Sequence, residues 1–164
     1  MKHSEGLEWA IHSCSLLAAL PPGTCLPSKL LAEFFDLPEA YLAKQMQKLS
    51  QAGIVETRRG PRGGYGLARP SADITLLQMV EAIDGDAQHF RCTEIRRCGP
   101  TGVANRHYTR PCGIARSLWK AEAAWREELN KVNLADINRM GQAETPPEQI
   151  AKALKWFQEK LAGA

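Results

Sequence analysis

The sequence contains no long run of apolar residues. No stretch approaches the roughly 20 consecutive apolar residues that a membrane-spanning helix requires. The start of the chain is no signal peptide either, because Glu5, Glu8 and His12 interrupt it and leave no apolar run of about seven residues. We therefore expect a cytoplasmic protein that does not enter a membrane.

The signatures of an enzyme are missing as well. The chain shows no nucleophile–base pair and no glycine-rich nucleotide loop. It also shows no internal repeat and no low-complexity tract, so a repeat architecture is not expected. Its 164 residues are 44% hydrophobic and 24% charged, which is near the average for globular proteins. The sequence therefore predicts one folded domain, with at most a helical extension, and no enzymatic activity.

The cysteine count is odd, which argues against a framework made only of disulfides. Three of the five cysteines, Cys92, Cys98 and Cys112, lie in one loop rich in glycine and arginine that also holds His107. Thiols stay reduced in the cytoplasm, where such clusters bind metal or sense redox state. These four side chains would suit an iron–sulfur cluster, a zinc ion or a metal-free thiol sensor. The other two cysteines are expected to be small buried hydrophobic residues.

Positive charge is concentrated in one segment of the chain. The net charge is only +3, but residues 41–69 hold six cations and one anion, a net +5, so the remainder carries −2. A basic segment of this kind is the footprint expected for a polyanion. The charge distribution therefore favours nucleic-acid binding.

Helical periodicity dominates the first half of the sequence. Apolar residues recur at helical spacing over residues 4–20, with Ser4 as the N-cap. Shorter helices are predicted over residues 28–35 and 38–52, and Gly53 is placed to end the second of these. A short helix, a tight turn and a polar-faced helix form the pattern of a helix-turn-helix.

The helix predicted over residues 38–52 has two faces. Leu42, Met46 and Leu49 are expected to face the core. The opposite face, expected to enter a DNA groove, carries Tyr41, Lys44, Gln45 and Lys48. Gln can read adenine and Lys guanine, although Lys contacts phosphate at least as often. Ser28, at the start of the preceding helix, is expected to cap it and to contact phosphate.

A basic hairpin follows this helix directly. Residues 54–55 and 65–67 are short strand candidates on either side of a Gly/Pro/Arg turn, and a hairpin in this place is a wing. The turn's glycines allow a tight reversal, and Arg59 and Arg62 are placed to enter a minor groove. A fourth helix is predicted over residues 74–85.

Residues 111–132 are predicted to form one long helix. At 1.5 Å per residue it is about 30 Å long, and its regular apolar stripe is larger than the small domain needs. A partner subunit is expected to cover the stripe unless the last helix folds across it. The stripe consists of Ile114, Leu118, Ala121, Trp125, Leu129 and Val132.

Three segments in this order resemble the IscR/NsrR-type winged-helix regulators. YLAKQMQKLSQAGIVETRRGPRGGY resembles their recognition helix and wing, and ITLLQMVEAIDG the helix after the wing. The cysteine loop and the long helix resemble their cluster-binding loop and dimerisation helix. The resemblance covers about residues 4–140. Members of this family are bacterial homodimeric transcription regulators that sense iron–sulfur status, nitric oxide, iron or redox state.

The cysteine spacing departs from the pattern of three closely spaced loop cysteines that many members use. Cys92 and Cys98 have the spacing of the family pattern, but the third cysteine comes later in the chain, at Cys112. In this it resembles the RsrR-like branch, to which the segments GLEWAIH and CTEIR…C-x-IAR are closely similar. That branch is associated with a [2Fe–2S] cluster and ligands from both subunits. The resemblance implies the ligand set Glu8, His12, Cys92 and Cys112, with Cys98 and His107 as alternative ligands.

The chemistry of Glu8 and His12 is compatible with this ligand set. The two residues are four apart, so a carboxylate and an imidazole lie on one helix face and can bind one iron. Thiolates would then hold the other iron, an asymmetry that Rieske centres also show. Without the resemblance, Glu8 would be read as a carboxylate that interacts favourably with the dipole at the helix N-terminus, and His12 as a residue of the polar face.

The fold expected from all of these features is mostly α with a small β-wing. It consists of a winged helix-turn-helix DNA-binding domain over residues 1–85, a cluster-binding loop over residues 86–112, a dimerisation helix region over residues 113–140, and a linker with a C-terminal amphipathic helix over residues 141–164. We expect a homodimer that binds double-stranded operator DNA.

Overall fold

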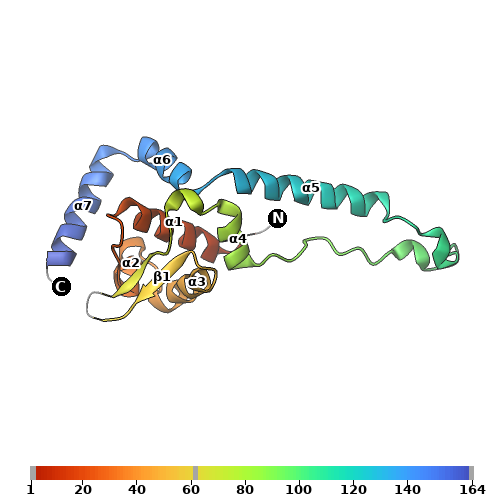
Figure 1. Ribbon diagram of the computed structural model, residues 1–164, viewed down its shortest axis with the longest axis horizontal. Coiled ribbons are helices and arrows are strands. Elements are labelled where there is room, and N and C mark those ends of the chain that lie inside the picture. Colours follow the sequence, from red (N-terminus) through yellow and green to blue (C-terminus); the bar gives the residue numbers. More distant parts are fainter. Residues whose placement is uncertain (1–2, 61–62, 163–164) are drawn as a thin grey trace.

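The computed structural model describes residues 3–60 and 63–162, with side chains as far as Lys160. The chain is mostly helical with one small antiparallel sheet, as predicted (Figure 1). Its elements are α1 (Glu5–Ala19), α2 (Ser28–Phe35), α3 (Glu39–Gln51), β1 (Val55–Arg58), β2 (Gly64–Leu67), η1 (Ser71–Asp73), α4 (Leu76–Asp84), η2 (Ile95–Arg97), η3 (Asn105–His107), α5 (Gly113–Lys131), α6 (Leu134–Glu144) and α7 (Pro147–Ala162). None of the helices in the described part is long and apolar enough to cross a membrane.

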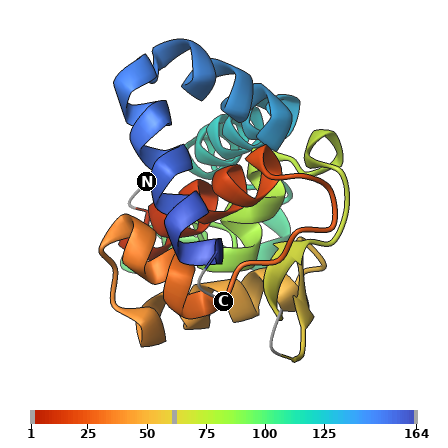
Figure 2. The same ribbon diagram turned by 90° about the vertical axis from the view of Figure 1, so that its left-hand side faces the viewer.

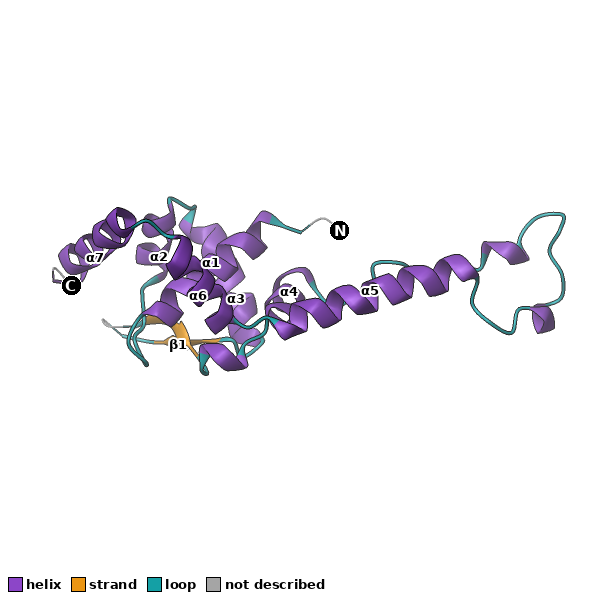
Figure 3. Cartoon of the chain, turned by 90° about the horizontal axis from the view of Figure 1, so that it is seen from above, coloured by secondary structure: helices purple, strands orange, loops and turns teal. Residues whose placement is uncertain are grey.

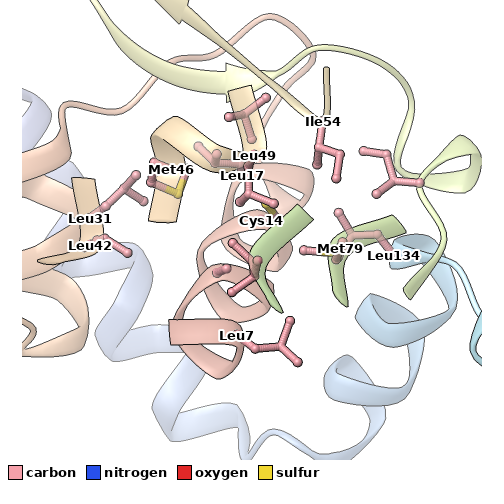
Figure 4. Close-up of a cluster of buried hydrophobic side chains, with 14 of the residues drawn as sticks. Leu7, Cys14, Leu17, Leu31, Leu42, Met46, Leu49, Ile54, Met79 and Leu134 are labelled. Atoms are coloured by element: carbon pink, nitrogen blue, oxygen red, sulfur yellow. The ribbon is translucent and has the colours of Figure 1, made fainter. Parts of the chain in front are cut away.

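Helices α1 to α4 and α6 enclose one hydrophobic core (Figure 4). Their apolar residues recur at helical spacing, so each helix turns one face inward. Burial raises the pKa of the Cys14 thiol to about 12, which makes this cysteine an inert core residue. The core includes Leu7, Leu17, Leu31, Leu42, Met46, Leu49, Ile54, Met79 and Leu134.

The helix-turn-helix matches the predicted boundaries to within one residue, and local backbone chemistry explains where its helices end. Asp36 adopts the left-handed conformation with φ 52°, and the N–H of Leu37 donates to the Ala32 carbonyl at 2.9 Å, which ends α2. Gly53 has φ 67° and stops α3 in the same way, as expected. The N–H of Ile54 then donates to the Leu49 carbonyl at 2.9 Å and leads the chain into the wing.

The wing is anchored to the segment that precedes α2. Strands β1 and β2 pair with Val55 opposite Leu67 and Arg58 opposite Gly64. In addition, Leu26 and Tyr65 exchange two backbone hydrogen bonds of 2.9 Å each. The close approach explains the glycine at position 64, where φ is 143° and an added Cβ would lie 2.2 Å from the Leu26 carbonyl oxygen.

Residues 85–131 leave the rest of the molecule and return to it; we call this segment the arm, and residues 3–84 and 132–162 the body (Figures 1 and 3). The arm consists of the cysteine loop, residues 86–112, and α5. Its C-terminal end is bonded to the segment where α4 begins, because the N–H of Leu76 donates to the Val132 carbonyl at 2.8 Å and the N–H of Leu134 to the Ile74 carbonyl at 2.9 Å. These bonds fix the root of the arm on the body.

Only the inner half of the predicted α5 stripe contacts the body. Trp125 and Leu129, near the root, pack against the core, whereas Ile114 and Leu118 are 70% and 43% exposed. The last helix does not cover them, because α7 folds back over α2 instead (Figure 2). The outer half of the stripe is therefore open in a single protomer.

The C-terminal region differs from the prediction at its centre. We expected a linker to begin at residue 141 and lead into the last helix, but α6 continues to Glu144 and α7 begins at Pro147. Gly141 is tolerated inside α6, and proline suits the first turn of α7. The ring of Phe157 stacks on Phe34 of α2 with centroids 5.0 Å apart. Leu161, expected in the apolar face of this helix, lies outside the described side chains.

Candidate functional site

Helix α3 presents part of the predicted DNA-reading surface. Tyr41 is 56% exposed, and Lys44 is exposed as well, as expected for a groove-facing side of the helix. The ring of Tyr41 meets the ring of Trp9 edge to face, with centroids 5.5 Å apart. The exposed face of α3 therefore begins directly beside α1.

Gln45 is not on this outer face, which corrects the prediction. Its side chain is only 6% exposed and packs over Gly6 of α1, where an added Cβ would lie 2.7 Å from the Gln45 Cδ. The amide Oε1 is buried without a hydrogen-bond partner among the described residues. The absent side chain at Gly6 creates the space, which the pattern within α3 alone does not reveal.

Lys48 and Ser28 also have local structural settings. The Lys48 ammonium donates to the Ile83 carbonyl at 2.7 Å, in the last turn of α4, where a cation stabilises the helix end. Pro27, not Ser28, occupies the N-cap of α2, so the expected Ser28 cap is wrong. The Ser28 hydroxyl is buried and has no hydrogen-bond partner in the described part of the chain.

The wing carries cations at its outer end. Arg59 follows β1 and is exposed, as predicted. Arg62, the second wing cation of the prediction, lies outside the described residues. Arg58 was not singled out from sequence; it pairs with Glu56 and donates to the Gly23 carbonyl at 2.8 Å. The described part of the wing thus offers Arg59 as a free cation.

The cysteine loop places its three thiols in different settings. Cys112 is the N-cap residue of α5, and its Sγ accepts the N–H of Ala115 at 3.3 Å. Cys92 and Cys112 are half-buried, whereas Cys98 and His107 are exposed. No disulfide joins any of the five cysteines.

Glu8 and His12 lie far from these thiols in the same protomer. Both are exposed on α1 and line a shallow pocket of about 420 Å³. Figures 1 and 3 show α1 in the body and the tip of the cysteine loop at the far end of the arm. Within residues 3–60 and 63–162, no three His, Cys, Asp or Glu side chains come together closely enough to hold a metal ion.

The chemistry of the separated donors nevertheless fits an iron–sulfur cluster. Cys112 lies at a helix N-terminus, a position that favours negatively charged groups, and its Sγ already accepts the N–H of Ala115. Glu8 and His12 face solvent, and their side chains make no hydrogen bond to any other described residue. A carboxylate and an imidazole on α1, with two thiolates on the loop, form a donor set of the mixed kind that Rieske centres illustrate.

Contacts between α5 and the loop were missed at the sequence level. The indole N–H of Trp119 donates to the Phe90 carbonyl at 3.0 Å, and Glu122 accepts from the backbone and ring of His89. His3 likewise pairs with Asp84. The partners lie 29 to 81 residues apart. The one local signal is that Trp119 and Glu122 are three residues apart and off the apolar stripe.

Comparisons with known proteins agree with this architecture. A family model described as "Rrf2: Iron-dependent Transcriptional regulator" matches residues 3–139. The protein YwgB of Bacillus subtilis is 38% identical over 91 residues, which are 56% of this chain and 58% of YwgB. The HTH-type transcriptional regulator NsrR of Bacillus subtilis is 28% identical over 157 residues, 94% of this chain and 98% of NsrR.

Two solved structures share the fold. The structure of CymR, the global cysteine regulator of B. subtilis, has a TM-score of 0.67 at 23% identity, covering 85% of this chain and 98% of CymR. T. potens IscR has a TM-score of 0.65 at 24% identity, covering 89% of this chain and 93% of IscR. The match of the family model over most of the chain, on a winged helix with a long arm, shows that the chain belongs to the Rrf2 family of transcriptional regulators.

Proposed function

We propose that this regulator is a bacterial homodimer that senses redox or iron–sulfur status through a [2Fe–2S] cluster. The ligands are Glu8 and His12 of one subunit and Cys92 and Cys112 of the other. One observation carries the proposal: among its described residues, a single protomer holds Glu8 and His12 on the body and the two thiols on the arm, and it brings no three such donors together. A second copy that covers the open α5 stripe supplies the missing half of each site.

Each half-site has a defined task. The α1 pair offers a carboxylate and an imidazole on one face, and the loop offers two sulfur donors, of which Cys112 lies at the N-terminus of α5. When bound, the cluster supplies a centre that gains or loses an electron reversibly. The protein holds it between two subunits, so the site reports on how the subunits sit together.

Packing between α1 and α3 connects the cluster site to the DNA surface. Gln45 fills the space over Gly6, and the rings of Trp9 and Tyr41 are in contact, so α1 cannot shift without moving side chains of α3. In a dimer, two recognition helices must match two half-sites of the operator, and their spacing controls affinity. A change at Glu8 and His12 therefore changes operator binding through α1.

Mixing two inactive variants tests the shared site. Glu8→Ala/His12→Ala and Cys92→Ser/Cys112→Ser homodimers should each lack a [2Fe–2S] spectrum under anaerobic conditions. A heterodimer of the two contains one complete site, and should regain about half of the wild-type visible absorption and iron. Recovery in the heterodimer requires ligands from both subunits. A heterodimer as colourless as its parents, beside a coloured wild type, would contradict the proposed ligand set.

A metal-free thiol sensor on the same fold is the alternative, and the exposure of the free thiol of Cys98 favours it. Iron and sulfide assays on anaerobically purified protein separate the two. The cluster proposal expects a red-brown protein whose operator affinity differs between oxidised, reduced and cluster-free forms, with little effect of Cys98→Ser. A colourless wild type whose response disappears in Cys98→Ser would support the thiol sensor.

For DNA, we propose that Tyr41 and Lys44 of α3 enter the major groove and that Arg59 and Arg62 of the wing contact a minor groove. Lys44→Ala should weaken operator binding and lower the slope of log K against log salt by about 1 if Lys44 contacts a phosphate. Lys48→Ala is the matched control, because its ammonium is already bonded to the Ile83 carbonyl. Equal slopes for Lys44→Ala and wild type would remove Lys44 from the phosphate contacts.

A further inference from the structure

The side chain of Arg96 closes the distal end of the cysteine loop. Its guanidinium donates to both carboxylate oxygens of Glu94, and Nη2 also donates to the Arg110 carbonyl at 3.1 Å. Glu94 lies two residues after Cys92, and Arg110 lies two residues before Cys112. One side chain therefore joins the two chain segments that carry the proposed thiolate ligands.

Tyr108 completes this arrangement. Its ring lies beside the guanidinium, with the Arg96 Cζ 5.3 Å from the ring centroid. Its hydroxyl donates to the Arg96 carbonyl at 2.7 Å and accepts the N–H of Val103 at 3.2 Å. We call the contacts among Glu94, Arg96, Tyr108 and the Arg110 carbonyl the Arg96 clamp.

The clamp consists of the stronger types of polar contact. A guanidinium that grips both oxygens of a carboxylate fixes direction as well as distance, which a point charge does not. The adjacent aromatic ring adds a cation–π contact. Glu94 has φ 53°, in the left-handed region that a non-glycine residue keeps only where its surroundings hold it. The clamp supplies such surroundings without any bound metal.

We propose that Arg96 is a positioning residue that brings the Cys92 and Cys112 segments together before a cluster binds. The proposal rests on the assigned roles of these two thiolates, but every contact in the clamp is made by protein atoms that are not proposed ligands. Closing a loop of this length costs conformational entropy. When the loop is already closed in the cluster-free protein, that entropy is not lost again when the cluster binds. Arg96 therefore favours cluster insertion and slows cluster loss.

Hydrogen exchange in the cluster-free protein tests the clamp by itself. Amides of residues 94–110, including the N–H of Val103, should exchange about tenfold faster in Arg96→Gln than in wild type, because a charge-assisted contact that closes the loop is lost. Arg97→Gln is the matched control: its Cζ is 5.6 Å from the same ring, but its side chain makes no hydrogen bond among the described residues. Equal exchange in Arg96→Gln and wild type would overturn the clamp.

The loaded protein tests the positioning role. A chelator should bleach the visible absorption of Arg96→Gln about tenfold faster than that of wild type, and the visible circular dichroism bands should shift. Arg96→Lys keeps the charge but not the two-pronged donor, so it should recover only part of the loss. If the loop of cluster-free Arg96→Gln exchanges faster but the loaded variant has the bleaching rate and dichroism of wild type, the positioning role would be overturned.

These measurements separate the two proposals. If wild type holds no cluster under any condition, the proposed cluster function fails, and with it the ligand-positioning role, while the exchange data still decide whether the clamp exists. If wild type holds a cluster and Arg96→Gln behaves like Arg97→Gln in both assays, the clamp proposal fails and the cluster function stands.

Discussion

The body and the arm are held in place by different forces. In the body, whole side chains such as Leu42, Met46 and Leu49 have no exposed surface, and burial of this kind is the main source of folding free energy. In the arm, Ala115 is the one buried residue among those described. Its loop is held mainly by separate hydrogen bonds, such as those of Trp119 and Arg96.

This difference indicates that the body is complete in one protomer and the arm is not. A typical hydrogen bond contributes only about 0.5–1.5 kcal/mol net, so a few of them do not offset an open apolar stripe in water. Rrf2 regulators act as dimers, and Ile114 and Leu118 are exposed apolar side chains that the protomer itself does not cover. The body carries the DNA-reading face of α3 on a complete core, whereas the arm keeps an apolar face that one protomer leaves open.

Truncation of the body core should have the largest effect. Leu42→Ala removes a fully buried side chain and should lower the free energy of unfolding by about 3 kcal/mol, as measured by urea denaturation. The loss should be the same at low and high protein concentration, because the cavity forms within one protomer.

Leu118→Ala is the counterpart in the arm. This side chain is 43% exposed, so the unfolding free energy of the protomer should change by less than about 0.5 kcal/mol, while the dimer dissociation constant should rise about tenfold. Sedimentation at several concentrations measures the second effect. A monomeric Leu118→Ala protein that is as unstable as Leu42→Ala would contradict the division into a complete body and an incomplete arm.

The contact between α1 and α3 predicts a smaller loss inside the body. In Gly6→Ala the new Cβ meets Gln45, and this overpacking should cost about 1–3 kcal/mol of stability. The better helix propensity of alanine offsets about 1 kcal/mol of that loss, so the protein should be destabilised overall. Gly141→Ala in α6, with nothing within 4 Å, should instead stabilise by up to about 1 kcal/mol. The double variant Gly6→Ala/Gln45→Ala should relieve the clash. If the stability changes of the two single variants simply add up in the double variant, as measured by thermal denaturation, the contact would be disproved.

Removal of one arm contact should have a local effect. Trp119→Phe loses the donor to the Phe90 carbonyl, which should cost about 1 kcal/mol and speed amide exchange in residues 86–91 by up to tenfold. Exchange in β1 and β2 should stay unchanged and serves as the internal control. A uniform increase across the whole protein would show that the arm and the body open together.

The smallest expected effect lies at the root, where α4 ends. Burial raises the pKa of Asp84, but hydrogen bonds from Ser4 and His3 outweigh it and hold the pKa below its ordinary value of 3.8. Because the pKa is lower in the folded state, this stabilisation is present above the ordinary value and is lost as the pH falls below it. Asp84→Asn should therefore lower stability at pH 6, by less than about 1 kcal/mol, and approach wild type as the pH falls below 3.8. If the stability difference between Asp84→Asn and wild type stayed the same as the pH was lowered, the link between this pKa and stability would be refuted.

Most of the body could be predicted from sequence, because its determinants are local. The spacing of Leu42, Met46 and Leu49 defines the buried face of α3, and Gly53 ends that helix by its own conformational freedom. Gln45 was misplaced for the opposite reason. Its burial depends on a missing side chain on α1, at Gly6, and no pattern within α3 contains that information.

The arm was predictable in outline but not in its contacts. The stripe on α5 indicated a long helix with a spare apolar face, and its outer half is indeed open. The carbonyl partners of Trp119 and Arg96 could not be identified, because hydrogen bonds to backbone carbonyls leave no residue-type signal at the acceptor. The assignment of cluster ligands rests on residues that one chain does not bring together.

The joined root of the arm has an evolutionary consequence. Since Ile74 and Leu134 are connected through their backbones, the chain between them is a loop closed at its base, with α4 packed in the body and the arm beyond it. Insertions at the tip then lengthen the loop without disturbing the register of any body element. A loop lengthened in this way can carry a cysteine as late in the chain as Cys112, so sensor chemistry can diversify while the DNA-reading surface is inherited intact.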